Sequence, residues 1–230
     1  MVTMNKCIRF LTIIFILCVL VGCGAKDAPA QVAATTLPVY EFTSILCQGT
    51  DITVSRLVTE NVSCLHDYTL QVKQMRMIES AKVIVLSGLG LEDFLSDALQ
   101  SRDRIIDASQ GIAPICPEEE HHEHDHHGHS HETDPHIWLS PENAKVMADN
   151  ICKELCIIYP QYNEQFQKNL LDLHTRLDAL QTYGEETLNS LKSRELVTFH
   201  DGLLTLPRVL IWKFSKQLRK NPAEKLLPQN

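Results

Sequence analysis

The chain has 230 residues, of which 44% are hydrophobic, 22% charged and 6% aromatic. These proportions are typical of a globular protein and exclude a largely disordered chain. The formal net charge of −8 argues against nucleic acid as a partner, because a polyanion favours a basic surface.

The first 22 residues have the pattern of a secretory signal peptide. Lys6 and Arg9 precede an apolar run over residues 10–21, which is shorter than the roughly 20 residues that a membrane-spanning helix needs. The run ends in LVGC, which resembles the lipobox of bacterial lipoproteins. That resemblance implies cleavage before Cys23, a diacylglycerol on its thiol, and a tether over residues 23–31. An uncleaved anchor is the alternative, and in both cases the rest of the chain faces outward.

Residues 32–160 are predicted to form an α/β lobe with a mostly parallel sheet. Short apolar or β-branched segments predict strands over residues 32–36, 52–58, 81–88 and 104–109. Helical patterns lie between them, at the stretch after Pro38, at 69–80 and at 91–100. Strands that alternate with helices indicate βαβ units.

A His-rich segment, residues 118–134, interrupts this pattern. It has no apolar periodicity and cannot bury a face, so we expect a surface loop. Its histidines are auxiliary, low-affinity metal ligands in this interpretation: His121, His122, His124, His126, His127, His129 and His131. Beyond it, Ser140 and Pro141 predict a helix start, with Ser as the cap and Pro at the first position.

A long linking helix is predicted over residues 161–194. Leucines at spacings of three and four give it one apolar face, and only Gly184 weakens the pattern. A helix of some 30 residues spans roughly 45 Å, so it could join two lobes. ELVTFHDG then predicts a new strand, the start of a second α/β lobe over residues 195–230.

Three histidines stand apart from the His-rich segment. His66 and His200 follow predicted strands, and His136 precedes a predicted helix. Ligands collect at the carboxyl ends of strands in open α/β sheets, which makes these three imidazoles candidate metal ligands.

The stretches CLHDYTLQ, SGLGLEDFL, DPHIWLSPENA and LVTFHDG, with the His-rich segment between the second and third, carry a resemblance from about residue 32 to 202. In these motifs the chain resembles the metal-binding lipoproteins of ABC importers, which take up zinc or manganese. The resemblance implies two α/β lobes joined by a rigid helix, with one metal in the cleft. It also implies the ligands His66, His136 and His200, and a carboxylate ligand from the second lobe.

The same resemblance implies an exported protein, lipid-anchored on the outer face of the cytoplasmic membrane or periplasmic. It implies a monomer that delivers its metal to an ABC permease and the ATPase subunit of that permease. No enzymatic activity is expected.

The residue types favour Zn²⁺ over Mn²⁺, because imidazole suits zinc and manganese prefers carboxylate oxygen. Each ligand imidazole needs a partner for its second nitrogen, and the neighbouring Asp67, Asp134 and Asp201 are candidates. His174, on the long helix, has no motif support and is interpreted as a surface residue. The His-rich segment is interpreted as a zinc collector beside the cleft, or else as a solvated acidic loop.

After Gly202 the resemblance stops. The tail from residue 203 to 230 is basic, and a changed reading frame or a natural short form would explain a truncated second lobe. A missing lobe would remove one wall of the cleft, weaken zinc binding and leave an apolar face of the long helix exposed.

Four other interpretations stay open: a manganese-binding member of the same family, a zinc hydrolase, an adhesin-like surface protein, and a zinc buffer that relies on the His-rich segment. The hydrolase lacks a base at HExxH-like spacing, and no adhesive repeat is present. Five cysteines follow the signal, an odd number. Cys152 and Cys156 are interpreted as buried apolar residues, and a Cys47–Cys64 disulfide is left open.

Overall fold

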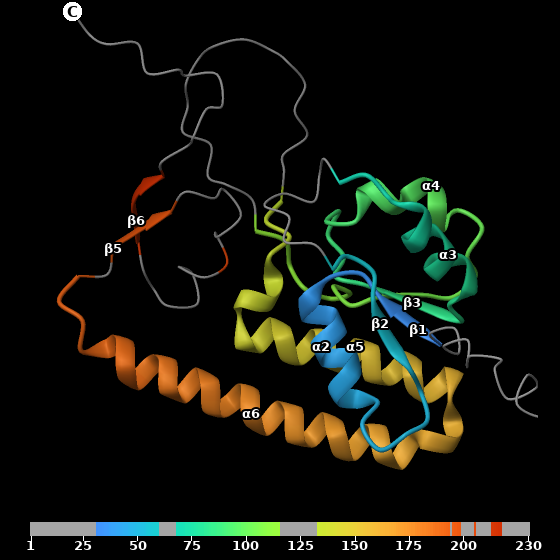
Figure 1. Ribbon diagram of the computed structural model, residues 1–230. Coiled ribbons are helices and arrows are strands. Elements are labelled where there is room, and N and C mark those ends of the chain that lie inside the picture. The colour runs from blue at the N-terminus through green and yellow to red at the C-terminus, as the bar shows by residue number, and fades with distance from the viewer. Residues whose placement is uncertain are drawn as a thin grey trace, which may run out of the picture.

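The computed structural model describes residues 31–59, 68–115, 133–193, 195–198, 205 and 213–217. Its main sheet has four parallel strands in the order β2-β1-β3-β4 (Figure 1). The strands are β1 (Val32–Ala34), β2 (Val54–Arg56), β3 (Val83–Leu86) and β4 (Ile105–Asp107). The predicted α/β fold with a parallel sheet is confirmed.

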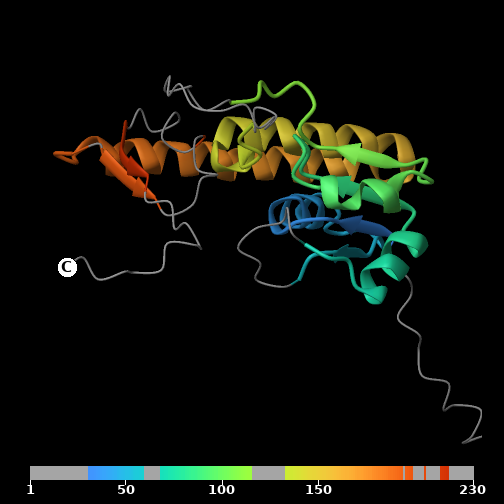
Figure 2. The ribbon, with the colours of Figure 1, turned by 90° about the horizontal axis from the view of Figure 1, so that it is seen from above.

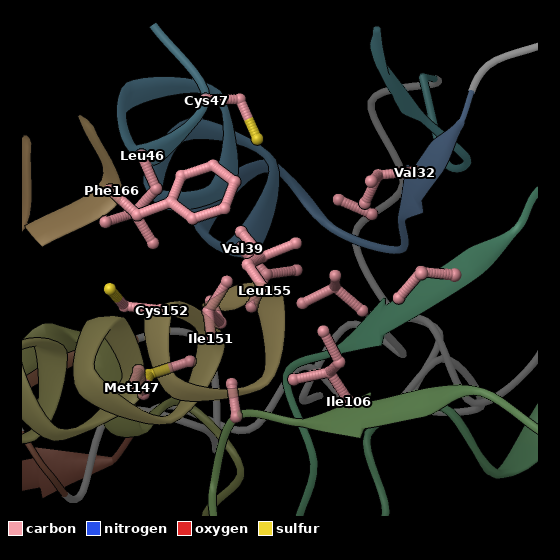
Figure 3. Close-up of a cluster of buried hydrophobic side chains, with 14 of the residues drawn as sticks. Val32, Val39, Leu46, Cys47, Ile106, Met147, Ile151, Cys152, Leu155 and Phe166 are labelled. Atoms are coloured by element: carbon pink, nitrogen blue, oxygen red, sulfur yellow. The ribbon is translucent and has the colours of Figure 1, made fainter. Parts of the chain in front are cut away.

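One face of the sheet packs against three helices: α2 (Leu37–Leu46), α5 (Pro141–Ile158) and α6 (Asn163–Asn189). Successive strand residues point to opposite faces, and Val32 and Ala34 turn toward these helices. Figure 3 shows the resulting core, in which Phe166 of α6 lies beside Leu46 of α2 and is fully buried. The start of α6 therefore packs against α2 and the sheet through Phe166.

The other face is covered by α3 (Val72–Ser80), the 3₁₀ turn η1 (Asp93–Leu95) and the short α4 (Ser96–Leu99). Ala33 and Ile84 point to this side and pack against Ile78 and Leu95. The single helix that the sequence predicts over 91–100 is instead split into η1 and α4, because the turn after β3 continues to Leu91 and Glu92.

Helices α5 and α6 form a hairpin through the 3₁₀ turn η3 (Pro160–Tyr162). The predicted start of α5 is confirmed, since the Asn143 N–H donates to the Ser140 hydroxyl at 3.3 Å. Along the hairpin, Ala144 and Ala148 of α5 pack against Leu173 and Leu177 of α6. Small residues facing large ones let the two helices approach closely.

Helix α6 has 27 residues, a length of about 40 Å, and runs on beyond α5 (Figure 2). Gly184 does not interrupt it. At its far end β5 (Glu195–Thr198) pairs in parallel with β6 (Lys213–Gln217), with a bulge between Leu196 and Val197. The predicted strand at 195 is confirmed, whereas β6 lies in the basic tail, where the sequence predicted no element.

Cys47, Cys152 and Cys156 are free thiols. Cys47 and Cys152 are buried, as the sequence suggested for Cys152, while Cys156 is only partly buried. The Cys47–Cys64 disulfide that the sequence left open is not formed, since the Cys47 thiol is free.

Among the described residues, no helix is both long enough and apolar enough to cross a bilayer. The predicted signal peptide and Cys23 fall outside the described residues.

Candidate metal centre

The carboxyl ends of the two central strands are held by one buried acid, Glu92. Its Oε1 accepts hydrogen bonds from the Thr35 hydroxyl, at 2.6 Å, and from the Ser87 N–H, at 2.7 Å. Its Oε2 accepts one from the Gly88 N–H at 3.0 Å. Burial raises the pKa of Glu92, and these three hydrogen bonds oppose that rise. Thr35 follows β1 and Ser87 follows β3, so Glu92 fixes the edge of the sheet at which ligands collect in α/β folds.

His136 lies in the connection that follows the carboxyl end of β4 and leads to α5. It immediately precedes the 3₁₀ turn η2 (Ile137–Leu139), whose first residue, Ile137, is fully buried in the main core. The His136 side chain is 21% exposed, and its ring centroid lies 5.2 Å from that of Trp138. The local fold therefore fixes the backbone of His136 and leaves its ring at the surface of the lobe.

Asp134 orients the His136 ring. Its Oδ1 accepts from the backbone N–H of His136 at 3.0 Å and lies 2.8 Å from the Nδ1 of the same residue. A carboxylate acceptor selects the tautomer with hydrogen on Nδ1, which puts the in-plane lone pair on Nε2. This carboxylate–imidazole pair is the arrangement that holds histidine ligands of zinc.

Thr205 completes the surroundings of Asp134. The Thr205 N–H and hydroxyl both donate to Asp134 Oδ2, each at 2.8 Å. Burial alone would raise the pKa of Asp134, but the hydrogen bonds from His136 and Thr205 outweigh it and hold that pKa below its usual value. Asp134 is therefore an ionised, buried carboxylate with donors on both oxygens.

The base of the His-rich segment lies beside this site. The Asp134 N–H donates to the Ile115 carbonyl at 2.8 Å, which joins the two described ends that flank residues 116–132. Ile115 therefore contacts Asp134, which precedes His136 by two residues.

Of the three predicted ligands, the structure describes His136. His66 and His200 lie outside the described residues, as do Asp67, Asp201 and the seven histidines of the His-rich segment. Within the described ranges no three histidine, cysteine or acidic side chains come together to hold a metal. His174 is not simply a surface residue: its Nε2 lies 3.0 Å from Asp149 Oδ1, between α6 and α5.

Sequence reasoning found Asp134 but missed Glu92 and Thr205. Asp134 was a candidate because it precedes His136 by two residues. Glu92 stands in a predicted amphipathic helix, where an acid is expected in solvent, and Thr205 follows the last recognised motif. Glu92 accepts from Thr35, 57 positions away, and Thr205 donates to Asp134, 71 positions away, so these contacts join distant segments.

Comparison with known proteins decides the family. A family model described as "ZnuA: Zinc-uptake complex component A periplasmic" matches residues 32–208. The chain belongs to this family. The resemblance stated from the motifs is confirmed, and the family is one of substrate-binding transport proteins.

Individual relatives and solved structures that are similar to this chain carry names of metal-binding or zinc-binding proteins. A protein of Treponema pallidum named for metal binding is 34% identical over 66% of this chain and 50% of its own length. The zinc-binding lipoprotein AdcA of Streptococcus pneumoniae is 32% identical over 79% of this chain and 38% of its own. A zinc-bound crystal structure of a ZnuA deletion mutant has a TM-score of 0.70 at 26% identity, covering 85% of this chain and 73% of the other. The chain thus spans half or less of the length of the first two relatives.

Proposed function

We propose that this chain captures Zn²⁺ outside the cytoplasm as the substrate-binding component of an ABC importer. The observation that carries the proposal is the Asp134–His136 pair, in which a buried carboxylate lies 2.8 Å from the Nδ1 of an imidazole in the connection between β4 and α5. The names of its relatives, zinc-binding lipoprotein AdcA and zinc-uptake component ZnuA, support zinc as the substrate.

The proposed ligands are His136, His66 and His200. Three imidazoles leave one position of the tetrahedral shell that zinc favours, for a water or a carboxylate. Imidazole nitrogen discriminates against Mn²⁺, which prefers oxygen. An excess of Mn²⁺ should therefore fail to displace Zn²⁺, and displacement would favour the manganese-binding alternative.

Delivery to a permease and its ATPase subunit, attachment to the membrane through Cys23, and action as a monomer belong to the same proposal. The family supports delivery to a permease, and the lipoprotein AdcA among the relatives supports attachment to the membrane. The family and fold are those of transport proteins rather than of hydrolases.

The His-rich segment is proposed to collect zinc beside the cleft. Support comes from the hydrogen bond between the Asp134 N–H and the Ile115 carbonyl, because Asp134 also accepts from His136. Flexible histidines and acids bind metal weakly and exchange it readily. A zinc buffer, in which the segment is the main binding element, is the competing function.

Deletion of residues 118–133 separates the two functions. The shortened chain should still bind one Zn²⁺ in a calorimetric titration if His136 belongs to the capture site. Adding His136→Gln to the deletion should abolish that event, while His174→Gln, a histidine paired with Asp149 between the helices, should leave it unchanged. A shortened chain that binds no zinc would favour the buffer.

A further inference from the structure

Asp134 receives hydrogen bonds from two segments that are far apart in the sequence. His136 donates to Oδ1 from its backbone N–H and from Nδ1, at 3.0 and 2.8 Å. Thr205 donates to Oδ2 from its backbone N–H and its hydroxyl, both at 2.8 Å. A carboxylate offers about four acceptor sites, so all of them are used. The side chain is fully buried, and it cannot turn without breaking bonds to both segments.

Asp134 and Thr205 are separated by 71 positions. Between them the chain passes along α5, returns along α6 for about 40 Å and enters β5 at the far end of the molecule (Figures 1 and 2). Thr205 follows the end of β5 by seven residues, and its hydrogen bonds bring the chain back to the loop of His136. Asp134 is thus a contact between the proposed metal-binding loop and the part of the chain that follows α6.

We propose that Asp134 is a positioning residue that couples zinc binding at His136 to the docking of the Thr205 segment. The inference rests on the zinc site proposed above. A cation on Nε2 polarises the imidazole and strengthens donation from Nδ1 to Oδ1, which holds the carboxylate where Oδ2 meets Thr205. Conversely, the two donors of Thr205 fix the carboxylate, and through it the ring.

Coupling of this kind is reciprocal, because the free energy that links two binding events is the same in both directions. If docking of Thr205 raises zinc affinity, zinc must raise the docking of Thr205 by the same factor. If the hydrogen bonds between Asp134 and Thr205 are purely structural, the expectation differs. Their loss would lower the stability of the zinc-free chain and leave both zinc affinity and zinc-dependent docking unchanged.

The test uses the full chain and three substitutions at the two residues. Thr205→Val removes the hydroxyl donor at nearly constant volume, Thr205→Ser restores it, and Asp134→Asn replaces one acceptor oxygen by a donor. Zinc affinity is measured by competition with a chromogenic chelator, up to one molar equivalent of Zn²⁺. Hydrogen exchange of the peptide that contains Thr205 is measured with and without Zn²⁺.

Loss of an outer partner of a metal ligand typically weakens metal affinity about 10- to 100-fold. Thr205→Val should lie at the lower end of that range and Asp134→Asn at the upper end, with Thr205→Ser close to the wild type. Zinc should slow exchange around Thr205 in the wild type and less in Thr205→Val. Thr182→Val is the matched control, because the Thr182 hydroxyl donates only within α6, to the Asp178 carbonyl at 3.0 Å.

Two results overturn the inference, and they are distinguishable. If His136→Gln abolishes zinc binding while Thr205→Val binds zinc with wild-type affinity and shows full zinc-dependent protection, the coupling is absent and the proposed function stands. If His136→Gln retains wild-type affinity, the proposed site is wrong and the coupling falls with it.

Discussion

Three glycines allow one substitution, Gly→Ala, to be tested in three different surroundings. Gly88 follows β3 at the edge of the sheet, with φ at +89°, and an added Cβ would lie 2.2 Å from both Asp107 Oδ1 and Ser109 Oγ. Gly111 has φ at +80° and open space around it. Gly184 lies within α6 and also has open space. An alanine would therefore meet backbone strain and steric overlap at Gly88, backbone strain alone at Gly111, and neither at Gly184.

The expected free-energy changes follow from these surroundings. Strain at a positive φ costs a non-glycine residue about 1–3 kcal/mol, so Gly111→Ala should destabilise by about that amount. At Gly88 the overlap also displaces Asp107, whose Oδ1 accepts from the Ser109 N–H and hydroxyl at 2.9 and 2.7 Å. Overpacking adds about 1–3 kcal/mol, giving roughly 2–6 kcal/mol in total. Gly184→Ala should stabilise by about 0.5–1 kcal/mol, because alanine favours a helix interior.

Thermal unfolding of the three full-length variants, followed by circular dichroism, checks this order. A chain of this size shifts its Tm by about 2–4 °C for each kcal/mol. The Tm should fall most for Gly88→Ala, fall less for Gly111→Ala and rise slightly for Gly184→Ala. A Gly88→Ala variant that unfolds at the wild-type temperature would refute the close contact with Asp107 and Ser109.

The remaining predictions concern the core and its thiols. Phe166→Ala should cost about 3–5 kcal/mol, because the ring is fully buried where α6 meets α2 and the sheet; a loss below about 1 kcal/mol in urea unfolding would contradict that packing. Asn169→Ala should cost about 1–3 kcal/mol, since Nδ2 donates to two carbonyls at the end of α2, each at 2.8 Å; a wild-type urea midpoint would show that water replaces the amide. Burial raises the pKa of Cys47 and of Cys152 to about 12, whereas a thiol of the unfolded chain has a pKa of about 8.5. The contribution of the two neutral thiols to the free energy of unfolding should therefore be fully present below about pH 8.5 and should be lost as the pH rises toward 12. The slope is up to about 1.4 kcal/mol per pH unit for each thiol, and the double variant Cys47→Ala/Cys152→Ala should flatten it; an equal slope would assign the alkaline loss to other groups.

Much of the first lobe could be predicted from the sequence because its elements carry local patterns. The continuous apolar run over residues 81–88 predicted a strand, and the structure forms β3 there and covers it with helices on both sides. Ser140 followed by Pro141 gave the first residue of α5 correctly. These predictions depend on periodicity and capping, which act within a few residues.

The rest of the site depends on contacts that no local pattern contains. Glu92 reads as a solvent-facing acid, and it becomes buried because the loops after β1 and β3 turn donors toward it. Thr205 reads as part of a tail with no recognised motif, and its role appears only when the chain returns to Asp134. Strand β6 is similar, because its parallel pairing with β5 depends on a crossover connection that no local pattern specifies.

The central claim is that the Nε2 atom of His136 coordinates the captured zinc together with histidines that are distant in the sequence. Anomalous diffraction at the zinc absorption edge, from crystals of the full chain grown with one molar equivalent of Zn²⁺, tests this directly. We expect one dominant peak at about 2.0–2.1 Å from His136 Nε2, the usual Zn–N distance, with the rings of His66 and His200 in the same coordination shell. A dominant peak held by other residues, with His136 turned away from it, would contradict the account.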